Sequence, residues 1–167
     1  CCDVVEHGFS DDSFNNLSYG HDRFALYEGY ETGSETGAPL APLMGDIVAF
    51  DGGASNGQFG ALCYMLAYCD HCVIYRFTPT NVNSADMDLF WLVNESARAG
   101  IDYDVDELMW LWDVTSVADQ TIIERNQAGV SSAFYRPGPY SPMETWASKF
   151  RDWYLQALGT CESGVTL

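Results

Sequence analysis

Positive charge is scarce in this sequence. It holds 7 lysine and arginine residues, with Lys149 as the only lysine, against 24 acidic residues, so the formal net charge at pH 7 is −17. Such a chain repels phosphate backbones, and we therefore expect it not to bind nucleic acid. The same charge would attract a cationic ligand, but we interpret it first as a surface that favours solubility.

Long apolar runs and a disulfide framework are missing as well. No stretch reaches the ~18 apolar residues that a membrane-spanning helix needs, and no basic segment followed by an apolar one marks a secretory signal. The six cysteines lack the regular spacing of a small disulfide-stapled domain. We therefore expect no membrane association, reduced thiols and a cytoplasmic protein.

The composition is that of a packed domain. Hydrophobic residues make up 47% of the 167 residues and aromatic residues 14%, which is enough for a core. Residues 1–45 are rich in Gly, Ser, Asn and acids, and we predict a loop-rich N-terminal part of the domain there. Residues 46–167 should form the domain core. Because the sequence starts at Cys1, we expect the domain to be incomplete on its N-terminal side.

Apolar periodicity predicts β-structure followed by helices. Four strands are expected, at residues 46–50, 58–68, 73–78 and 87–93, and their short links favour an antiparallel meander. Three helical segments are expected after them, at residues 104–112, 116–127 and 141–158. Ser141 should cap the last helix and Gly159 should stop it. A long C-terminal helix on an antiparallel sheet is an α+β fold.

Asp119 is the residue with the clearest chemical interest. It shares a predicted helix face, expected to turn inward, with three apolar residues, Ile122, Ile123 and Val130. A carboxylate in a core costs several kcal/mol unless it is paired, protonated or bound to a metal ion, and Asn126 and Gln127 add amides nearby. Alternatively, Ser116 and Asp119 have the spacing of a capping box at the start of a helix. On spacing alone, this capping role is favoured over metal binding.

Residues 110–130 resemble the C-terminal region of Rieske ring-hydroxylating oxygenase α subunits. The resemblance is carried by Asp119, the Ile-Ile-Glu that follows it closely, and then Asn-Gln-Ala-Gly-Val. Residues 71–79 and 135–155 are similar to the same family, and the likeness extends over about residues 40–158. Within that family, the sequence looks most like the choline and glycine-betaine monooxygenase-like enzymes.

The resemblance implies a helix-grip (START-like) catalytic domain, in which an antiparallel sheet wraps on a long C-terminal helix. It implies that Asp119 is catalytic, as the carboxylate of a mononuclear Fe(II) site that also has two histidines. Asn126 and Gln127 would support this ligand, while Trp112 and Ile123 would line the substrate space. For any single tryptophan, core packing remains the alternative to cation–π contact with a quaternary ammonium group.

The resemblance also implies the reaction and its partners. The substrate would be a small quaternary ammonium or aromatic compound, which is hydroxylated or oxidatively demethylated with O₂. Electrons would come from NAD(P)H through a separate reductase and a 2Fe-2S cluster. Homotrimers are common in the family.

Several ligands that this family needs are missing from the sequence. His7 and His21 lie far apart in Gly- and acid-rich sequence and are expected to be surface or loop residues, not iron ligands. A Rieske cluster needs Cys-x-His and a later Cys-x-x-His. Cys69, Asp70 and His71 imitate only the first half, so we expect them at a strand junction without a metal ion.

The Rieske domain is therefore expected to be absent from this sequence, and the isolated chain is expected to be inactive. Two alternatives to an oxygenase stay open. The chain could be a non-catalytic helix-grip module that binds an apolar or amphipathic ligand, or an inactive fragment.

Overall fold

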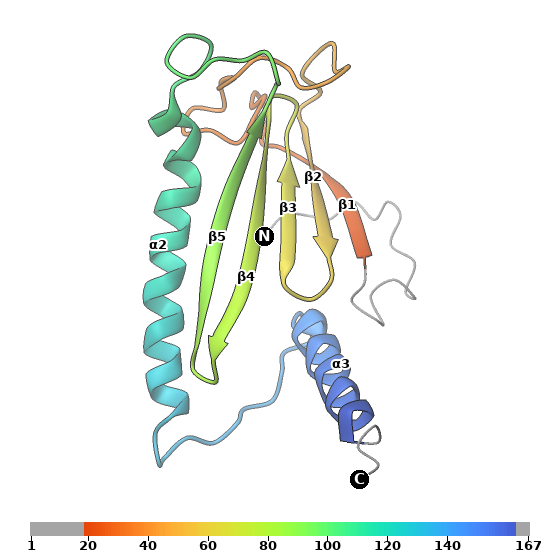
Figure 1. Ribbon diagram of the computed structural model, residues 1–167, viewed down its shortest axis with the longest axis vertical. Helices are drawn as coiled ribbons and strands as arrows, with labels where there is room; N and C mark the ends of the chain where they lie inside the picture. The colour runs from red at the N-terminus through yellow and green to blue at the C-terminus, as the bar shows by residue number, and fades with distance from the viewer. Residues whose placement is uncertain (1–18, 163–167) are drawn as a thin grey trace.

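The computed structural model describes residues 19–162, which form a five-stranded sheet and two helices (Figure 1). The elements are β1 (Tyr19–Ala25), β2 (Gly53–Phe59), β3 (Cys63–Ala67), β4 (His71–Asn81), β5 (Ser84–Val93), α2 (Val105–Val130) and α3 (Thr145–Glu162). The strand order follows the chain, and every neighbouring pair is antiparallel. The predicted α+β class and the antiparallel meander are confirmed.

The predicted strands at residues 73–78 and 87–93 are confirmed as parts of β4 and β5. β4 continues past Pro79, where the sequence suggested that it would end. A shift of register between Pro79 and Asn81 accommodates the proline, because a bulge does not require the backbone N–H that proline lacks.

The strand predicted at residues 46–50 is wrong. The backbone N–H of Ile47 donates to the carbonyl of Met44 at 3.1 Å, and Gly45 has a φ of 52°, so the chain turns here. Val48 is 92% exposed. This apolar run forms no strand and belongs to the long connection between β1 and β2, residues 26–52, which contains no helix or strand.

The single strand predicted at residues 58–68 is also wrong, because the segment holds a hairpin. Gln58, one residue before the end of β2, pairs with Tyr64, the second residue of β3. Between them Gly60 adopts a φ of 67°, a conformation that glycine accepts at little cost. The side chain of Gln58 donates to the carbonyl of Gly60 at 3.0 Å and so stabilises the turn.

The hydrophobic core lies on one face of the sheet, which we call the α2 face. Its buried cluster joins four strands or turns to one helix: Phe24, Ala54, Tyr68, Val73 and Trp112. Val73 of β4 pairs with Trp91 of β5, and Tyr75 pairs with Leu89, so that these side chains extend the same face. α2 therefore covers the sheet through the indole of Trp112.

α2 is one continuous helix, so the predicted break between residues 112 and 116 is wrong. Its start is as predicted: the Asp104 carboxylate accepts the backbone N–H groups of Asp106 at 2.9 Å and Glu107 at 3.1 Å. Thr115 is a weak helix former, yet it lies inside the helix, where its hydroxyl donates to the Leu111 carbonyl at 2.8 Å without interrupting the helix. Ser116 and Asp119 are thus mid-helix, and the capping-box alternative is wrong.

Only the first three turns of α2 are anchored. Leu108 and Trp112 are buried and Ser116 is half-buried, whereas Ile122 is 64% and Ile123 is 63% exposed. The expectation that the face shared with these isoleucines turns inward is therefore wrong for the part of the chain that the structure describes. Within residues 19–162 nothing covers this end of the helix.

α3 begins later and ends later than predicted. Glu144 accepts the backbone N–H of Ser141 at 2.6 Å, which is one half of a capping box, but residues 141–144 form a turn and the helix starts at Thr145. It continues past Gly159 to Glu162. None of its described side chains is buried, and Figure 1 shows α3 beyond the β2–β3 turn. The described helix that packs on the sheet is α2.

In residues 19–162, neither helix is both long enough and apolar enough to span a bilayer.

The continuity of α2 predicts which substitutions weaken it. Asp104→Ala removes the cap and should lower the free energy of unfolding by about 1 kcal/mol. Ser116→Ala should change it by less than about 0.5 kcal/mol, because alanine is a good mid-helix residue. Denaturant titration followed by far-UV circular dichroism measures both values. A loss for Ser116→Ala as large as that for Asp104→Ala would indicate that a second helix starts at residue 116.

Candidate functional site

Two fully buried polar side chains lie where the β3–β4 turn meets β4. Asp70 and His71 are both 0% exposed, and Cys69 beside them is 5% exposed. The backbone N–H of Tyr68 donates to the carbonyl of His71 at 2.8 Å and closes the turn. The predicted place of these residues, at a strand junction, is therefore confirmed.

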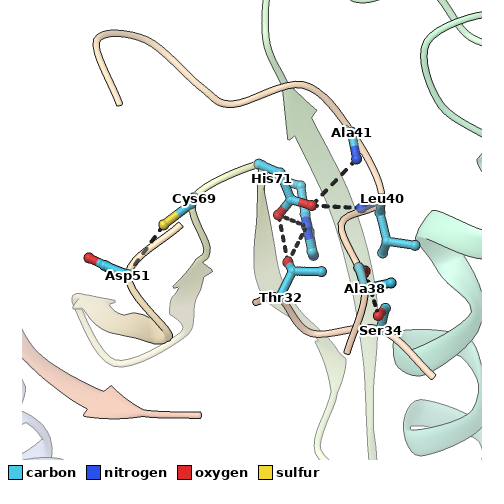
Figure 2. A network of polar contacts seen from close by, with 9 residues as sticks. Thr32, Ser34, Ala38, Leu40, Ala41, Asp51, Cys69 and His71 are labelled. Atoms are coloured by element: carbon cyan, nitrogen blue, oxygen red, sulfur yellow. Dashed lines mark hydrogen bonds and ion pairs between the residues drawn. The ribbon is translucent and has the colours of Figure 1, made fainter. Parts of the chain in front are cut away.

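The Asp70 carboxylate accepts hydrogen bonds from two places in the connection between β1 and β2. The Thr32 hydroxyl donates to Oδ1 at 2.5 Å, and the backbone N–H groups of Leu40 and Ala41 donate to Oδ2 at 2.9 and 3.4 Å (Figure 2). His71 Nδ1 lies 2.8 Å from Oδ1. We call these five residues the Asp70 network. It ties the connection between β1 and β2 to the sheet.

Hydrogen bonds keep Asp70 charged although it is buried. Burial opposes the charged form, but the bonds from His71, Thr32 and Leu40 outweigh it and hold the pKa of Asp70 below its usual value. The carboxylate can only accept, so His71 Nδ1 must carry the hydrogen of their shared bond. His71 Nε2 is buried and has no hydrogen-bond partner among the described residues.

Close packing surrounds the His71 ring. Tyr68 stacks on it with ring centroids 4.8 Å apart and an angle of 19°. A Cβ atom on Gly33 would come within 2.5 Å of the Tyr68 ring, so that only glycine fits there. The network is thus sealed from solvent, and its geometry supports a structural role.

The cysteines of this turn are structural as well. Cys69 Sγ lies 3.5 Å from Asp51 Oδ1 (Figure 2), and its carbonyl accepts the backbone N–H of Met44 at 2.8 Å. Burial raises the pKa of both thiols, that of Cys72 to about 11. Both shifts disfavour the thiolate form that disulfide exchange needs.

The described residues do not form a complete metal site. Residues 19–162 contain no group of three His, Cys, Asp or Glu side chains that could hold a metal ion. His21 is exposed on β1, His71 is enclosed in the Asp70 network, and His7 lies outside the described residues. Asp119 could therefore supply one carboxylate ligand, and two imidazoles would have to come from elsewhere.

Asp119 lies on the stripe of α2 that faces the sheet, where burial ends. It follows Trp112 by seven residues and Ser116 by three, so all three share one side of the helix. Asp119 itself is exposed. Because Asp119 is exposed, burial gives no argument that it binds a metal ion, and its assignment to iron stays a prediction.

The other predicted site residues are spread along α2. Trp112 is 5% exposed, and its ring contacts Tyr68 at 6.1 Å between centroids, which makes it a core residue in this chain. Asn126 is exposed, and Gln127 Nε2 donates to Ser131 Oγ at 3.3 Å near the end of the helix. The roles predicted for Trp112, Ile123, Asn126 and Gln127 stay predictions.

Tyr75 is a neighbour of this site that sequence reasoning did not single out. Its ring meets Trp112 edge-on, with centroids 6.0 Å apart and an angle of 76°. Burial raises the pKa of the Tyr75 phenol, the Ser116 hydroxyl lowers it in part, and the Asp119 charge raises it further. The alternation of β4, which places Val73 and Tyr75 on one face, was the available signal.

Asp70→Asn should destabilise the protein strongly. The amide removes the charge and turns one acceptor into a donor that faces other donors, so the free energy of unfolding should fall by on the order of 3 kcal/mol. Asp51→Asn, at a half-exposed carboxylate, should change it by less than about 1 kcal/mol. Chemical denaturation measures both, and equal losses would contradict a special role for Asp70.

Wild type and Asp70→Asn should also differ in how their stability depends on pH. The pKa of Asp70 is lower in the folded than in the unfolded chain, whose ordinary value is 3.8. The stability that this charge contributes is therefore complete above pH 3.8 and is lost as pH falls through the folded pKa. The difference in unfolding free energy between wild type and Asp70→Asn should shrink below that pH. A difference that stays constant down to pH 2.5 would contradict the prediction.

Comparison with known proteins places this chain in a family. The family described as ring hydroxylating alpha subunit (catalytic domain) matches residues 42–160. The chain is 38% identical over 90 residues to the glycine betaine monooxygenase oxygenase subunit of Chromohalobacter salexigens, a match that covers 53% of this chain and 20% of that protein. Subunits with the same name from two Pseudomonas aeruginosa strains are 37% identical over 90 residues, covering 53% and 21%.

The chain spans about a fifth of the length of these curated relatives. The family match, in contrast, runs through β2 to β5, through α2 with Asp119, and through most of α3. Because it covers well over half of the sequence, this chain belongs to the family of ring hydroxylating alpha subunits, of which it carries the catalytic domain region.

Proposed function

We propose that this chain is the catalytic-domain portion of a Rieske-type non-haem iron oxygenase that hydroxylates or oxidatively demethylates a small substrate. The family match over residues 42–160, which includes Asp119, is the observation that carries the proposal. The relatives are named for glycine betaine, a methylated ammonium compound. We therefore place a quaternary ammonium substrate ahead of an aromatic one.

In this proposal Asp119 is the carboxylate of a site completed by two histidines from outside the described residues. The iron, when bound there, supplies the chemistry that activates O₂. The part of this chain is to hold the carboxylate on a rigid helix, at the level where α2 leaves the core. The exposure of Asp119 leaves it accessible to those further ligands.

The proposal keeps the helix-grip architecture, with a substrate cavity between a helix and the antiparallel sheet. It is supported by α2 on one face of the meander and by the exposed isoleucines on its second half. Trp112 and Ile123, which lie seven residues before and four residues after Asp119, would line the cavity. Asn126 and Gln127 would support the ligand from about two turns further along the helix.

The balance of the reaction requires partners. Hydroxylation of one C–H bond with O₂ consumes two electrons and two protons, and one oxygen atom leaves as water. A hydroxylated N-methyl carbon then departs as formaldehyde. NAD(P)H would supply the electrons through a separate reductase and a 2Fe-2S cluster. The ligands of that cluster would lie outside this sequence, which has no Cys-x-x-His. A trimeric assembly is part of the same proposal.

A second candidate is a helix-grip module that binds an apolar or amphipathic ligand without chemistry. It is favoured by one observation: no three metal-ligating side chains gather in residues 19–162. The two candidates differ in whether the complete protein binds a mononuclear iron at all.

Asp119→Ala should remove that iron from the complete protein. We expect mononuclear iron content and turnover to fall by more than about tenfold, while the visible absorption of the Rieske cluster stays unchanged. Asp113→Ala, at an exposed carboxylate on the same helix, is the matched control and should keep both. Metal analysis with absorption spectroscopy measures the outcome. Full iron content and turnover in Asp119→Ala would reject the assignment, and a wild-type protein without mononuclear iron would favour the binding module.

A further inference from the structure

We propose that residues 26–52, the connection between β1 and β2, form a strap that opens as a unit while the sheet and α2 stay folded. When closed, the strap covers the β3–β4 turn, and the hydrogen bond from Thr32 to Asp70 is its main attachment. When open, it gives solvent access to Cys69, Asp70 and His71. This movement requires neither iron nor the proposed reaction.

The strap leaves the sheet and returns to it at one place. The last pair of β1 and β2 joins Ala25 to Gly53, and directly beyond it the backbone N–H of Leu26 donates to the carbonyl of Gly52 at 2.8 Å. Gly52 has a φ of 68°, a conformation that glycine adopts at little cost. The strap is therefore a long loop with joined ends, which can move without changing how the strands pair.

Little apolar packing holds the strap. Its buried residues are all small: Thr32, Gly33, Ser34 and Gly37. None of its large apolar side chains is buried, and Tyr27 and Val48 are 82% and 92% exposed. The buried core cluster contains no residue of the strap, although Leu26 at its base packs against that cluster. Segments with few buried apolar contacts are the ones that open locally in a folded protein.

The Asp70 carboxylate holds the strap closed (Figure 2). It accepts the Thr32 hydroxyl at 2.5 Å and the backbone N–H of Leu40 at 2.9 Å. Hydrogen bonds to a charged group are roughly twice as strong as those between neutral groups. When the strap opens, the carboxylate is no longer buried, and water replaces Thr32 and Leu40 as its donors. Opening therefore exchanges hydrogen bonds with water and exposes few apolar atoms.

Two further hydrogen bonds attach the strap to the sheet. The backbone N–H of Met44 donates to the Cys69 carbonyl at 2.8 Å, and the side-chain amide of Asn94, which follows β5, donates to the Leu43 carbonyl at 2.7 Å. Both bonds join neutral groups and contribute less than a bond to a carboxylate. The buried Cys69 thiol also lies 3.5 Å from Asp51 Oδ1 in the strap. Opening of the strap should therefore expose this thiol.

Hydrogen exchange of the complete protein, resolved to single amides by mass spectrometry with fragmentation, tests this movement. Thr32→Val removes the hydroxyl from Asp70 and keeps the branched shape of the side chain. Thr36→Val is the matched control, because Thr36 is an exposed threonine of the same strap whose hydroxyl accepts the backbone N–H of Ala38 at 3.3 Å. Alkylation of the Cys69 thiol by N-ethylmaleimide reports the same opening through a side chain.

The amides to compare are those of Leu40 and Met44 in the strap and that of Val73 in β4, which lies between β3 and β5. In wild type, after correction for intrinsic rates, the strap amides should exchange at least about 100-fold faster than the Val73 amide, because they need only a local opening. Thr32→Val should accelerate strap exchange and Cys69 alkylation by about 10- to 100-fold. Exchange at Val73 should stay within about twofold, and Thr36→Val should leave all three rates within about twofold.

Equal exchange of the Leu40 and Val73 amides in wild type would overturn the inference, because the strap would then open only when the whole domain unfolds. An equal acceleration of both amides in Thr32→Val would have the same meaning. Strap exchange as slow as in wild type in a folded Thr32→Val variant would also overturn it, since the bond to Asp70 would then not hold the strap.

Should Thr32→Val fail to fold, Asn94→Asp takes its place. This substitution keeps the side-chain oxygen that accepts the backbone N–H of Ser96 at 3.0 Å and removes the amide that donates to the Leu43 carbonyl. It should accelerate exchange of the Leu40 amide by about fivefold at an unchanged rate for Val73. An unchanged Leu40 rate, or an equal acceleration at Val73, would overturn the inference.

Discussion

A charged carboxylate without access to solvent, that of Asp70, is the constraint on which this fold depends. A buried charge without partners costs several kcal/mol, and the partners of Asp70 come from Thr32, Leu40 and its neighbour His71. Two of them belong to the connection between β1 and β2. Asp70 is therefore satisfied only when that connection has folded over the β3–β4 turn.

This requirement explains how a long segment without helix or strand has a defined place. Connections in compact domains seldom exceed ~12–15 residues, and the one between β1 and β2, residues 26–52, is longer. Because no ladder satisfies its backbone, the turn supplies acceptors for part of it. The Asp70 carboxylate accepts the N–H groups of Leu40 and Ala41, and the Cys69 carbonyl accepts that of Met44. The contact of Gly33 with the Tyr68 ring then joins this connection to the core, where Tyr68 also meets Trp112. Loop, sheet and helix thus share one packed centre.

The sequence predicts those parts of the structure that depend on neighbours along the chain. The alternation of β4 and β5 and the cap at Asp104 are local patterns, and both are confirmed. The turn at Gly60 was also a local signal, but the apolar residues around it outweighed it. The bond from Thr32 to Asp70 joins residues 38 positions apart, and the edge-on contact of Tyr75 with Trp112 depends on how α2 lies on the sheet. Such contacts follow from tertiary packing, which periodicity does not encode.

Because α2 is continuous, its exposed second half moves as one rigid body with the first half, which is anchored in the core. Trp112 and Asp119 are separated by seven residues of unbroken helix, or about 10 Å at the usual rise. A tilt of about 5° at the indole would therefore carry the carboxylate by about 1 Å, without any change in the helix itself. A core substitution or a molecule bound against the sheet that tilts α2 at Trp112 would therefore also displace Asp119.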